Sequence, residues 1–178
     1  MVATAAWCSR LLSGTSYDLA VNLGVCGSFD QSLVPGAVVH IASDRIADLG
    51  AEDGERFLTV QELQLLGDDD FPFAGGLLVN RQPPAIPPLH TLPAVAGITV
   101  NTVHGREDSI AAVAERFHPQ VESMEGAAFM YACLIHGVPF AQVRAVSNVV
   151  ERRNRAAWRV HEAIDSVCRA GLELLERA

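Results

Sequence analysis

The segment Ser123-Met124-Glu125-Gly126 combines a carboxylate and a thioether at the predicted start of a helix over residues 125–136. The helix macrodipole favours the ionised form of a carboxylate in this position. An ionised carboxylate accepts two hydrogen bonds at once, which suits the vicinal diol of a ribose, and Met124 beside it can pack on a sugar face. The same pattern also fits a first-turn acid next to a core methionine, so both interpretations stay open.

A second segment, Arg144-Ala145-Val146-Ser147-Asn148, places polar side chains at the end of an apolar run. Open α/β sheets bind ligands at the carboxyl ends of their strands, where such side chains would gather. The alternative is that Ser147 and Asn148 cap the following segment while Arg144 pairs with an acid.

A third segment holds Gly24 and Gly27 directly after a predicted strand over residues 19–23. Small residues in this position let backbone N–H groups approach a ligand closely. The spacing is neither that of a dinucleotide-binding loop nor that of a phosphate-binding loop of an NTPase. A tight turn against another backbone is the alternative. Cys26 has no neighbour in sequence that would activate it, so we expect a small buried thiol.

Composition limits the classes of function. The chain has 178 residues, a formal net charge of −8, thirteen arginines and no lysine, which argues against binding nucleic acid. No apolar run reaches the roughly 20 residues of a membrane helix. Six histidines show no HxH or HExxH spacing, so we expect no metal site. We also expect no cofactor. Four widely spaced cysteines and no recognisable signal peptide predict a reduced, cytoplasmic protein.

These segments must be positioned by alternating strands and helices. Besides the strand over residues 19–23, the pattern predicts strands over residues 37–42, 76–80, 97–105 and 140–146. It predicts helices over residues 3–12, 109–117 with Asp108 as cap, 125–136 with Gly137 as stop, and 154–177. The proline-rich stretch over residues 81–93 is predicted to be a surface loop. This order indicates one α/β domain whose sheet is covered by helices on both faces.

Taken together, the segments resemble the purine and uridine phosphorylase/hydrolase superfamily, and within it the futalosine-cleaving hydrolases. The matching stretches are YDLAVNLGVCGSFD, PGAVVHIASD, ITVNTVHG, VESMEGAAFMYAC and VPFAQVRAVSNVVERRN. They occur in the order of that family and cover nearly the whole chain, and the combination of SMEGAA with RAVSN at this separation is specific. The resemblance implies a three-layer α/β/α sandwich with a mixed central sheet.

The resemblance also implies roles for individual residues. Glu125 matches the glutamate that holds the ribose hydroxyls and stabilises an oxocarbenium-like transition state. Arg144 matches the arginine near the attacking water, and Asn148 lies where the family stabilises the leaving base. The implied substrate-binding residues are Val25, Cys26, Gly27, Val103, His104, Ser123, Met124 and Ser147.

The residue type at position 148 indicates which purine base the enzyme would release. Adenine-cleaving members of the superfamily have an aspartate at the matching position. An asparagine amide can donate to the 6-oxo group of hypoxanthine while its carbonyl accepts from a protonated N7. A mismatched base would leave buried polar groups unpaired, so this arrangement discriminates strongly. We therefore expect a 6-oxopurine nucleoside such as futalosine as the substrate.

The expected activity is hydrolysis of futalosine to hypoxanthine and dehypoxanthinyl futalosine in menaquinone biosynthesis. Alternatives are a purine nucleoside phosphorylase, a methylthioadenosine/adenosylhomocysteine nucleosidase-like enzyme, or an inactive fragment that only binds a ligand or partner. The family's N-terminal strand and the loop with its general base have no counterpart before the helix over residues 3–12, so residues 1–178 are expected to be one N-terminally truncated domain. The resemblance further implies a homo-oligomer, at least a dimer.

Overall fold

The computed structural model describes all residues 1–178. In chain order its elements are α1 (Val2–Gly14), β1 (Ala20–Ser28), β2 (Val38–Asp44), β3 (Gly50–Asp53), β4 (Arg56–Thr59), β5 (Leu78–Val79), α2 (Pro87–Thr91), β6 (Ala94–Thr99), α3 (Glu107–Phe117), β7 (Val121–Ser123), α4 (Gly126–His136), β8 (Phe140–Val149), a 3₁₀ turn (Arg155–Ala157) and α5 (Val160–Leu175). No helix has both the length and the apolar character needed to cross a membrane.

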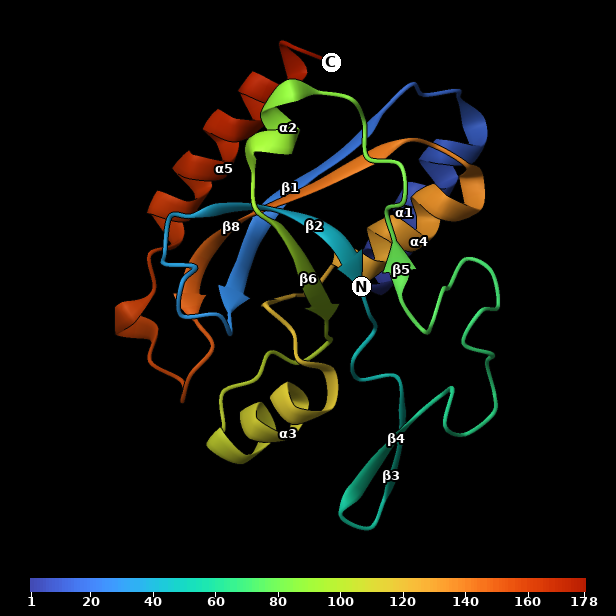
Figure 1. Cartoon of the computed structure of the whole chain (residues 1–178), viewed down its shortest axis with the longest axis vertical. Coiled ribbons are helices and arrows are strands. Elements are labelled where there is room, and N and C mark those ends of the chain that lie inside the picture. Colours follow the sequence, from blue (N-terminus) through green and yellow to red (C-terminus); the bar gives the residue numbers. More distant parts are fainter.

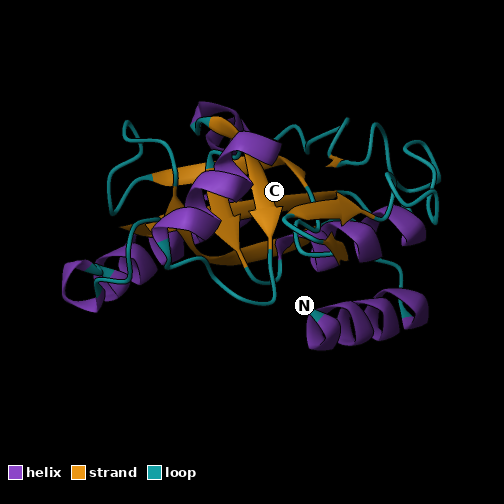
Figure 2. Cartoon of the chain, turned by 90° about the horizontal axis from the view of Figure 1, so that it is seen from below, coloured by secondary structure: helices purple, strands orange, loops and turns teal.

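A central sheet flanked by helices confirms the predicted α/β class. α5 covers one side of the sheet, whereas α4 and α1 cover the other (Figure 1). The view from below shows α1 as the outermost element on its side, separated from the strands (Figure 2). The helix α4 is buried along most of its length because nearly all of its side chains are apolar. It therefore lies between α1 and the sheet.

The main sheet is mixed and closes on itself. Its strand order is β5-β2-β6-β7-β1-β8, and β2 also pairs with β8. The closing pair is antiparallel and joins Val38 to Ala145. β1 and β8 run parallel, so their carboxyl ends meet at the same edge. β7 enters at that edge antiparallel to β1.

The prediction that Gly24 and Gly27 break the first strand is wrong, because β1 continues through both to Ser28. An added Cβ at Gly24 would lie 3.1 Å from Nη1 of Arg144. The register between β1 and β8 shifts between Cys26 and Gly27, which marks a bulge. The two glycines thus give room to side chains of the neighbouring strand instead of ending their own.

Three other boundaries differ from the prediction. The proline-rich stretch contains the short helix α2, because Pro87 occupies its first position and Leu89 is buried. The strand predicted up to residue 105 ends at Thr99. The helix α3 begins with Arg106 at its N-cap, and Asp108 lies in its first turn.

Two further differences concern charged segments. The acidic stretch after β2 forms the β3–β4 hairpin, in which Gly50 pairs with Thr59. The C-terminal helix begins at Val160 instead of residue 154, because the 3₁₀ turn Arg155–Ala157 precedes it. Neither difference moves the residues that we expect to do chemistry.

Candidate active site

Glu125 lies at the N-cap of α4, directly after β7. β7 ends at Ser123 and α4 begins at Gly126, so only Met124 and Glu125 connect the two elements. Both are exposed, Met124 to 39% of its surface. Ser123 is buried, and its hydroxyl accepts a 3.3 Å hydrogen bond from the N–H of Gly126. The short connection therefore presents a carboxylate and a thioether side by side at an open surface.

Arg144 lies inside the sheet on β8, with only 1% of its surface exposed. Its Nη1 donates a 3.0 Å hydrogen bond to the side-chain oxygen of Asn22, and its Nε has no partner. Burial lowers the pKa of Arg144, while the carboxylates of Asp44 and Glu125 act in the opposite direction. Arginine stays charged even so. Its positive charge is therefore held close to the carboxylate of Glu125.

A buried polar network fixes the start of α4, and the sequence analysis did not single it out. The Thr99 hydroxyl accepts a 2.7 Å hydrogen bond from the N–H of Ala127 and donates to Asp44 at 2.9 Å. Gln142 donates to the second oxygen of Asp44 at 3.0 Å. Burial raises the pKa of Asp44 to about 6, although these hydrogen bonds act in the opposite direction. The only indication of this network in the sequence was Asp44, a carboxylate at the carboxyl end of the second strand.

Asn148 lies beside Gly27, its register partner on β1. An added Cβ at Gly27 would lie 3.3 Å from Nδ2 of Asn148 and 2.8 Å from a methyl group of Val150. The amide donates to the Val149 carbonyl at 2.9 Å, and its oxygen faces the Ser147 hydroxyl at 2.8 Å. One N–H and one lone pair of the amide are left free. The absence of a side chain at Gly27 thus leaves the space that the Asn148 amide occupies.

The side chains of Val25 and Cys26 pack in the interior. The side chain of Val25 packs into the core between the sheet and α5. Cys26 is buried, and burial raises the pKa of its thiol to about 12. A thiol that stays protonated is a poor nucleophile, which agrees with the expectation of a structural cysteine. The Cys26 carbonyl accepts a 3.1 Å hydrogen bond from the Ser147 hydroxyl.

Val103 and His104 lie in the loop that follows β6. Val103 packs against the small core under α3. The N–H of His104 donates to Oε1 of Glu122 at 3.1 Å, and its ring Nδ1 pairs with Oε2 of the same carboxylate. Glu122 is buried on β7 and is the register partner of Gly27. Sequence reasoning missed this partner, because nothing close in sequence to Glu122 indicates that it pairs with a loop histidine.

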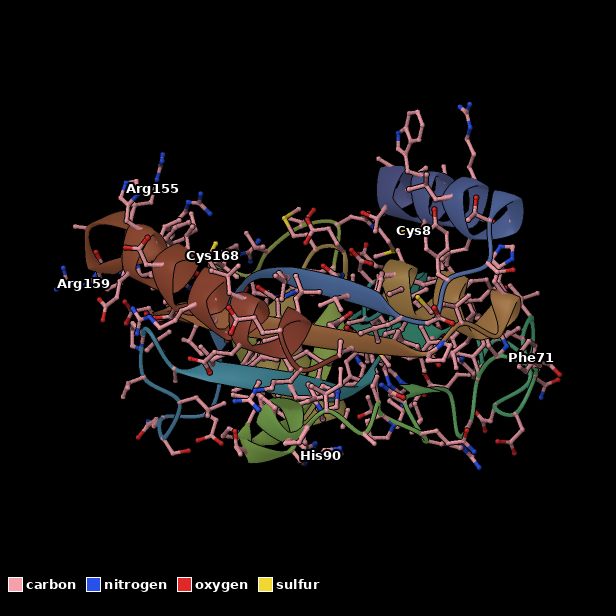
Figure 3. The ribbon with its side chains drawn as sticks, turned by 90° about the horizontal axis from the view of Figure 1, so that it is seen from above. Cys8, Phe71, His90, Arg155, Arg159 and Cys168 are labelled. Atoms are coloured by element: carbon pink, nitrogen blue, oxygen red, sulfur yellow. The ribbon has the colours of Figure 1, made fainter.

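The structure thus gathers the predicted residues into two adjoining groups. Glu125 lies close to Arg144, whereas Gly27 joins Asn148 on one side to the Glu122–His104 pair on the other. A cavity of about 520 Å³ lies elsewhere, against Phe71 and the first residue of β8. In Figure 3, Phe71 and the arginines that follow Asn148 in sequence, Arg155 and Arg159, lie at opposite ends of the molecule. That cavity contains none of the predicted site residues.

Sequence comparison relates the chain to known enzymes. The family model described as "Phosphorylase superfamily" matches residues 1–178. The futalosine hydrolase of Streptomyces coelicolor is 37% identical over 161 residues, which cover 86% of this chain and 63% of the relative. That of Thermus thermophilus is 32% identical over 162 residues, 89% of this chain and 69% of the relative. The chain therefore spans less than two thirds of the Streptomyces relative.

Solved structures share the fold at low sequence identity. The native structure of futalosine hydrolase from Helicobacter pylori superposes with a TM-score of 0.80 at 12% identity, covering 99% of this chain and 76% of that chain. A 5'-methylthioadenosine/S-adenosylhomocysteine nucleosidase from Neisseria meningitidis, solved with methylthio-immucillin-A, gives 0.80 at 16% identity, covering 99% and 77%. Both comparisons speak for the fold alone.

Proposed function

This chain belongs to the phosphorylase superfamily, and on that premise we propose that it acts as a futalosine hydrolase. The reaction cleaves the N-glycosidic bond of futalosine, releasing hypoxanthine and dehypoxanthinyl futalosine, a step of menaquinone biosynthesis. The similarity to two futalosine hydrolases supports the substrate. The observation that carries the proposal is the Asn148 amide, which keeps one donor and one acceptor free.

Glu125 acts on the sugar in this proposal. Its carboxylate accepts hydrogen bonds from the two ribose hydroxyls and stabilises the positive charge that develops as the bond to the base breaks. The buried guanidinium of Arg144 interacts electrostatically with this carboxylate. Met124, exposed beside it, packs on the sugar. This is catalysis by positioning and electrostatics, and it uses no covalent intermediate.

Asn148 acts on the leaving base. Its free N–H donates to O6 of hypoxanthine, and its free carbonyl lone pair accepts from N7–H. Stabilising the departing base in this way lowers the barrier to bond cleavage. Ser147 supports Asn148 through the contact between its hydroxyl and the amide oxygen. The arrangement favours 6-oxopurines over 6-aminopurines.

Arg144 is proposed to orient the attacking water on the face of the sugar away from the base. The guanidinium keeps its Nε free of protein partners although the atom is buried. The hydrogen bond from Nη1 to the Asn22 side chain holds the guanidinium in place from inside the sheet. The chemistry needs no metal or cofactor.

The test is to incubate the protein with futalosine in phosphate-free buffer and to measure free hypoxanthine by chromatography. Release without phosphate supports the hydrolase. Release that requires phosphate identifies a phosphorylase instead. If the protein cleaves methylthioadenosine, with release of adenine, in preference to futalosine, it is a methylthioadenosine/adenosylhomocysteine nucleosidase. Futalosine binding without release identifies a chain that only binds its ligand.

We also propose that residues 1–178 are one domain, and that the protein is cytoplasmic and at least a dimer. The match of one family model along the whole chain supports the single domain. Four free cysteines support a reducing compartment. Trp7 and Leu11 on α1 are 60% and 56% exposed, which supports burial against a second copy. Sedimentation velocity at several concentrations measures the assembly, and a monomer at all of them contradicts it.

A further inference from the structure

A histidine–carboxylate pair lies across strand β1 from Asn148 and has no part in the steps above. Glu122 is only 4% exposed, and both of its oxygens are used by His104, Oε1 by the backbone N–H and Oε2 by ring Nδ1. The His104 side chain is 17% exposed, and no protein group forms a hydrogen bond with its other nitrogen, Nε2. One ring nitrogen is therefore held from inside the protein while the other is available to a ligand.

The pair adjoins the place assigned to the base. Gly27 is the register partner of both Glu122 on β7 and Asn148 on β8. Directly opposed residues point to the same face of a sheet, and Gly27 has no side chain to fill the space between the other two. The loop after Asn148 also returns to the histidine loop, because the Arg153 N–H donates to the Gly105 carbonyl at 3.1 Å. His104 and Asn148 thus border one region from two sides.

The carboxylate decides which ring nitrogen carries the proton. Ionised Glu122 has no hydrogen to give, so it can only accept from Nδ1–H. A neutral imidazole held in this way has its lone pair on Nε2. In its neutral form His104 therefore offers an acceptor, not a donor, to a ligand at Nε2.

We propose that His104 reads the purine through Nε2, and that Glu122 is the positioning residue that sets its tautomer. The inference rests on the proposed function. Hypoxanthine has a hydrogen on N1, which Nε2 accepts, whereas adenine has a lone pair on N1, which meets the lone pair of Nε2. N1 and N7 lie on either side of O6 in the purine. His104 at N1 and Asn148 at O6 and N7 thus divide the recognition of one base between two strands.

The variant Glu122→Gln should move the ring proton of His104 from Nδ1 to Nε2, because the introduced amide fits in only one orientation. The His104 backbone N–H needs an acceptor, so the carbonyl oxygen of the introduced amide must take the Oε1 position. The NH₂ group of that amide then faces Nδ1 and donates to it, which moves the ring proton to Nε2. The altered imidazole offers a donor that suits N1 of adenine and opposes N1–H of hypoxanthine.

The experiment measures dissociation constants of hypoxanthine, 1-methylhypoxanthine and adenine by calorimetry. We expect wild-type protein to prefer hypoxanthine over both other bases by at least tenfold, because a recognition site with unpaired polar groups discriminates strongly. Glu122→Gln should shift the hypoxanthine-to-adenine ratio toward adenine by at least tenfold. His104→Phe, which does not depend on the buried carboxylate, should remove the penalty against 1-methylhypoxanthine. Glu115→Gln on the exposed face of α3 is the matched control.

Two outcomes are kept apart by this design. If wild-type protein binds none of the bases and releases no hypoxanthine from futalosine, the proposed function fails. If it binds hypoxanthine but Glu122→Gln and His104→Phe keep the wild-type ratios, the inference about His104 alone is overturned. Nitrogen-15 spectra of labelled histidine give an independent readout, in which Nε2 of His104 should be unprotonated in wild type and protonated in Glu122→Gln.

Discussion

Glu125 and Arg144 form a unit in which the carboxylate is exposed and the guanidinium is buried. Arg144 is buried against Gly24 and Asn22, and its charge acts on Glu125 from inside the sheet. The pairing explains why a long cationic side chain occupies an interior position where an aliphatic residue would pack more simply.

The proposed function makes Asn148 the residue that selects the base, so Asn148→Asp should change the base preference. The new carboxylate accepts from a 6-amino group but has no hydrogen to donate to O6. We expect kcat/KM for futalosine to fall at least tenfold, and release of adenine from an adenine nucleoside to rise relative to it. Competition between the two substrates, followed by chromatography, measures the ratio. An unchanged ratio would contradict the role assigned to Asn148.

Gly27→Ala tests whether the missing side chain on β1 gives Asn148 its place. The added Cβ would lie 2.8 Å from Val150 and 3.3 Å from the Asn148 amide, so one of them must move. We expect kcat/KM to fall about tenfold or more, since small displacements of a positioned group cost that much, while the Tm changes by only a few degrees. Gly14→Ala, where nothing lies within 4 Å, is the control. Equal activity of the two variants would speak against the proposed geometry.

Asp44 makes the stability of the protein depend on pH. Its folded pKa of about 6 lies above the ordinary value of 3.8, so the folded state holds the proton more tightly than the unfolded state. The stability that it contributes is complete below the ordinary value and is lost as the pH rises through about 6. Asp44→Asn does not titrate. The free energy of unfolding of the variant, measured in urea, should therefore rise relative to that of wild type between about pH 4 and pH 7, by a few kcal/mol at most.

One result of this comparison would contradict the prediction for Asp44. A difference in free energy of unfolding between Asp44→Asn and wild type that stays constant from about pH 4 to pH 7 would mean that Asp44 is not the titrating group. The amide of the variant can be accommodated because Gln142 can turn its unpaired Oε1 toward it. Loss of a hydrogen bond therefore does not mask the titration.

Among the elements, α4 does most to position the site. Its first two N–H groups are held by Ser123 and Thr99, and Thr99 is in turn oriented by Asp44. This arrangement satisfies donors that a helix start leaves open. It also fixes the direction in which Glu125 leaves the sheet.

Gly126→Ala should disturb this arrangement. An added Cβ would overlap with the Asp44 carboxylate and lie 2.9 Å from the Ser123 hydroxyl. We expect a loss of stability of about 1–3 kcal/mol, as is usual for overpacking, and a fall in kcat because Glu125 moves with the helix start. Denaturant unfolding and steady-state kinetics measure the two effects. A variant as stable and as active as wild type would show that the helix start is more adaptable than this packing indicates.

The elements differ in how far the sequence predicts them. α4 could be predicted because an apolar run ends at Gly137, which adopts a φ of 64° at the helix stop. β1 could not be followed past Gly24, because glycine weakens strands unless tertiary contacts override this tendency. Here the guanidinium of Arg144 and the amide of Asn148 occupy the space above the glycines. Those contacts come from another strand, so the residues next to the glycines in sequence do not indicate them.

At the scale of the whole molecule, closure of the sheet brings distant residues together. β2 pairs with β8 although the two strands are far apart in sequence, and this closure lets Gln142 reach Asp44. The individual residues Glu125, Arg144 and Asn148 could be selected from the sequence by type and by resemblance. Their supporting partners Asp44, Thr99 and Glu122 could not, because long-range pairing alone makes them neighbours.

The most direct test of the account compares wild type with Glu125→Gln in phosphate-free buffer. The release of hypoxanthine from futalosine is followed under single-turnover conditions, and ligand binding is measured separately. The account predicts that the variant keeps its fold and still binds hypoxanthine, but releases it from futalosine at least a hundredfold more slowly, because a neutral amide cannot stabilise the ribosyl cation. A variant that cleaves futalosine at close to the wild-type rate would contradict the central claim.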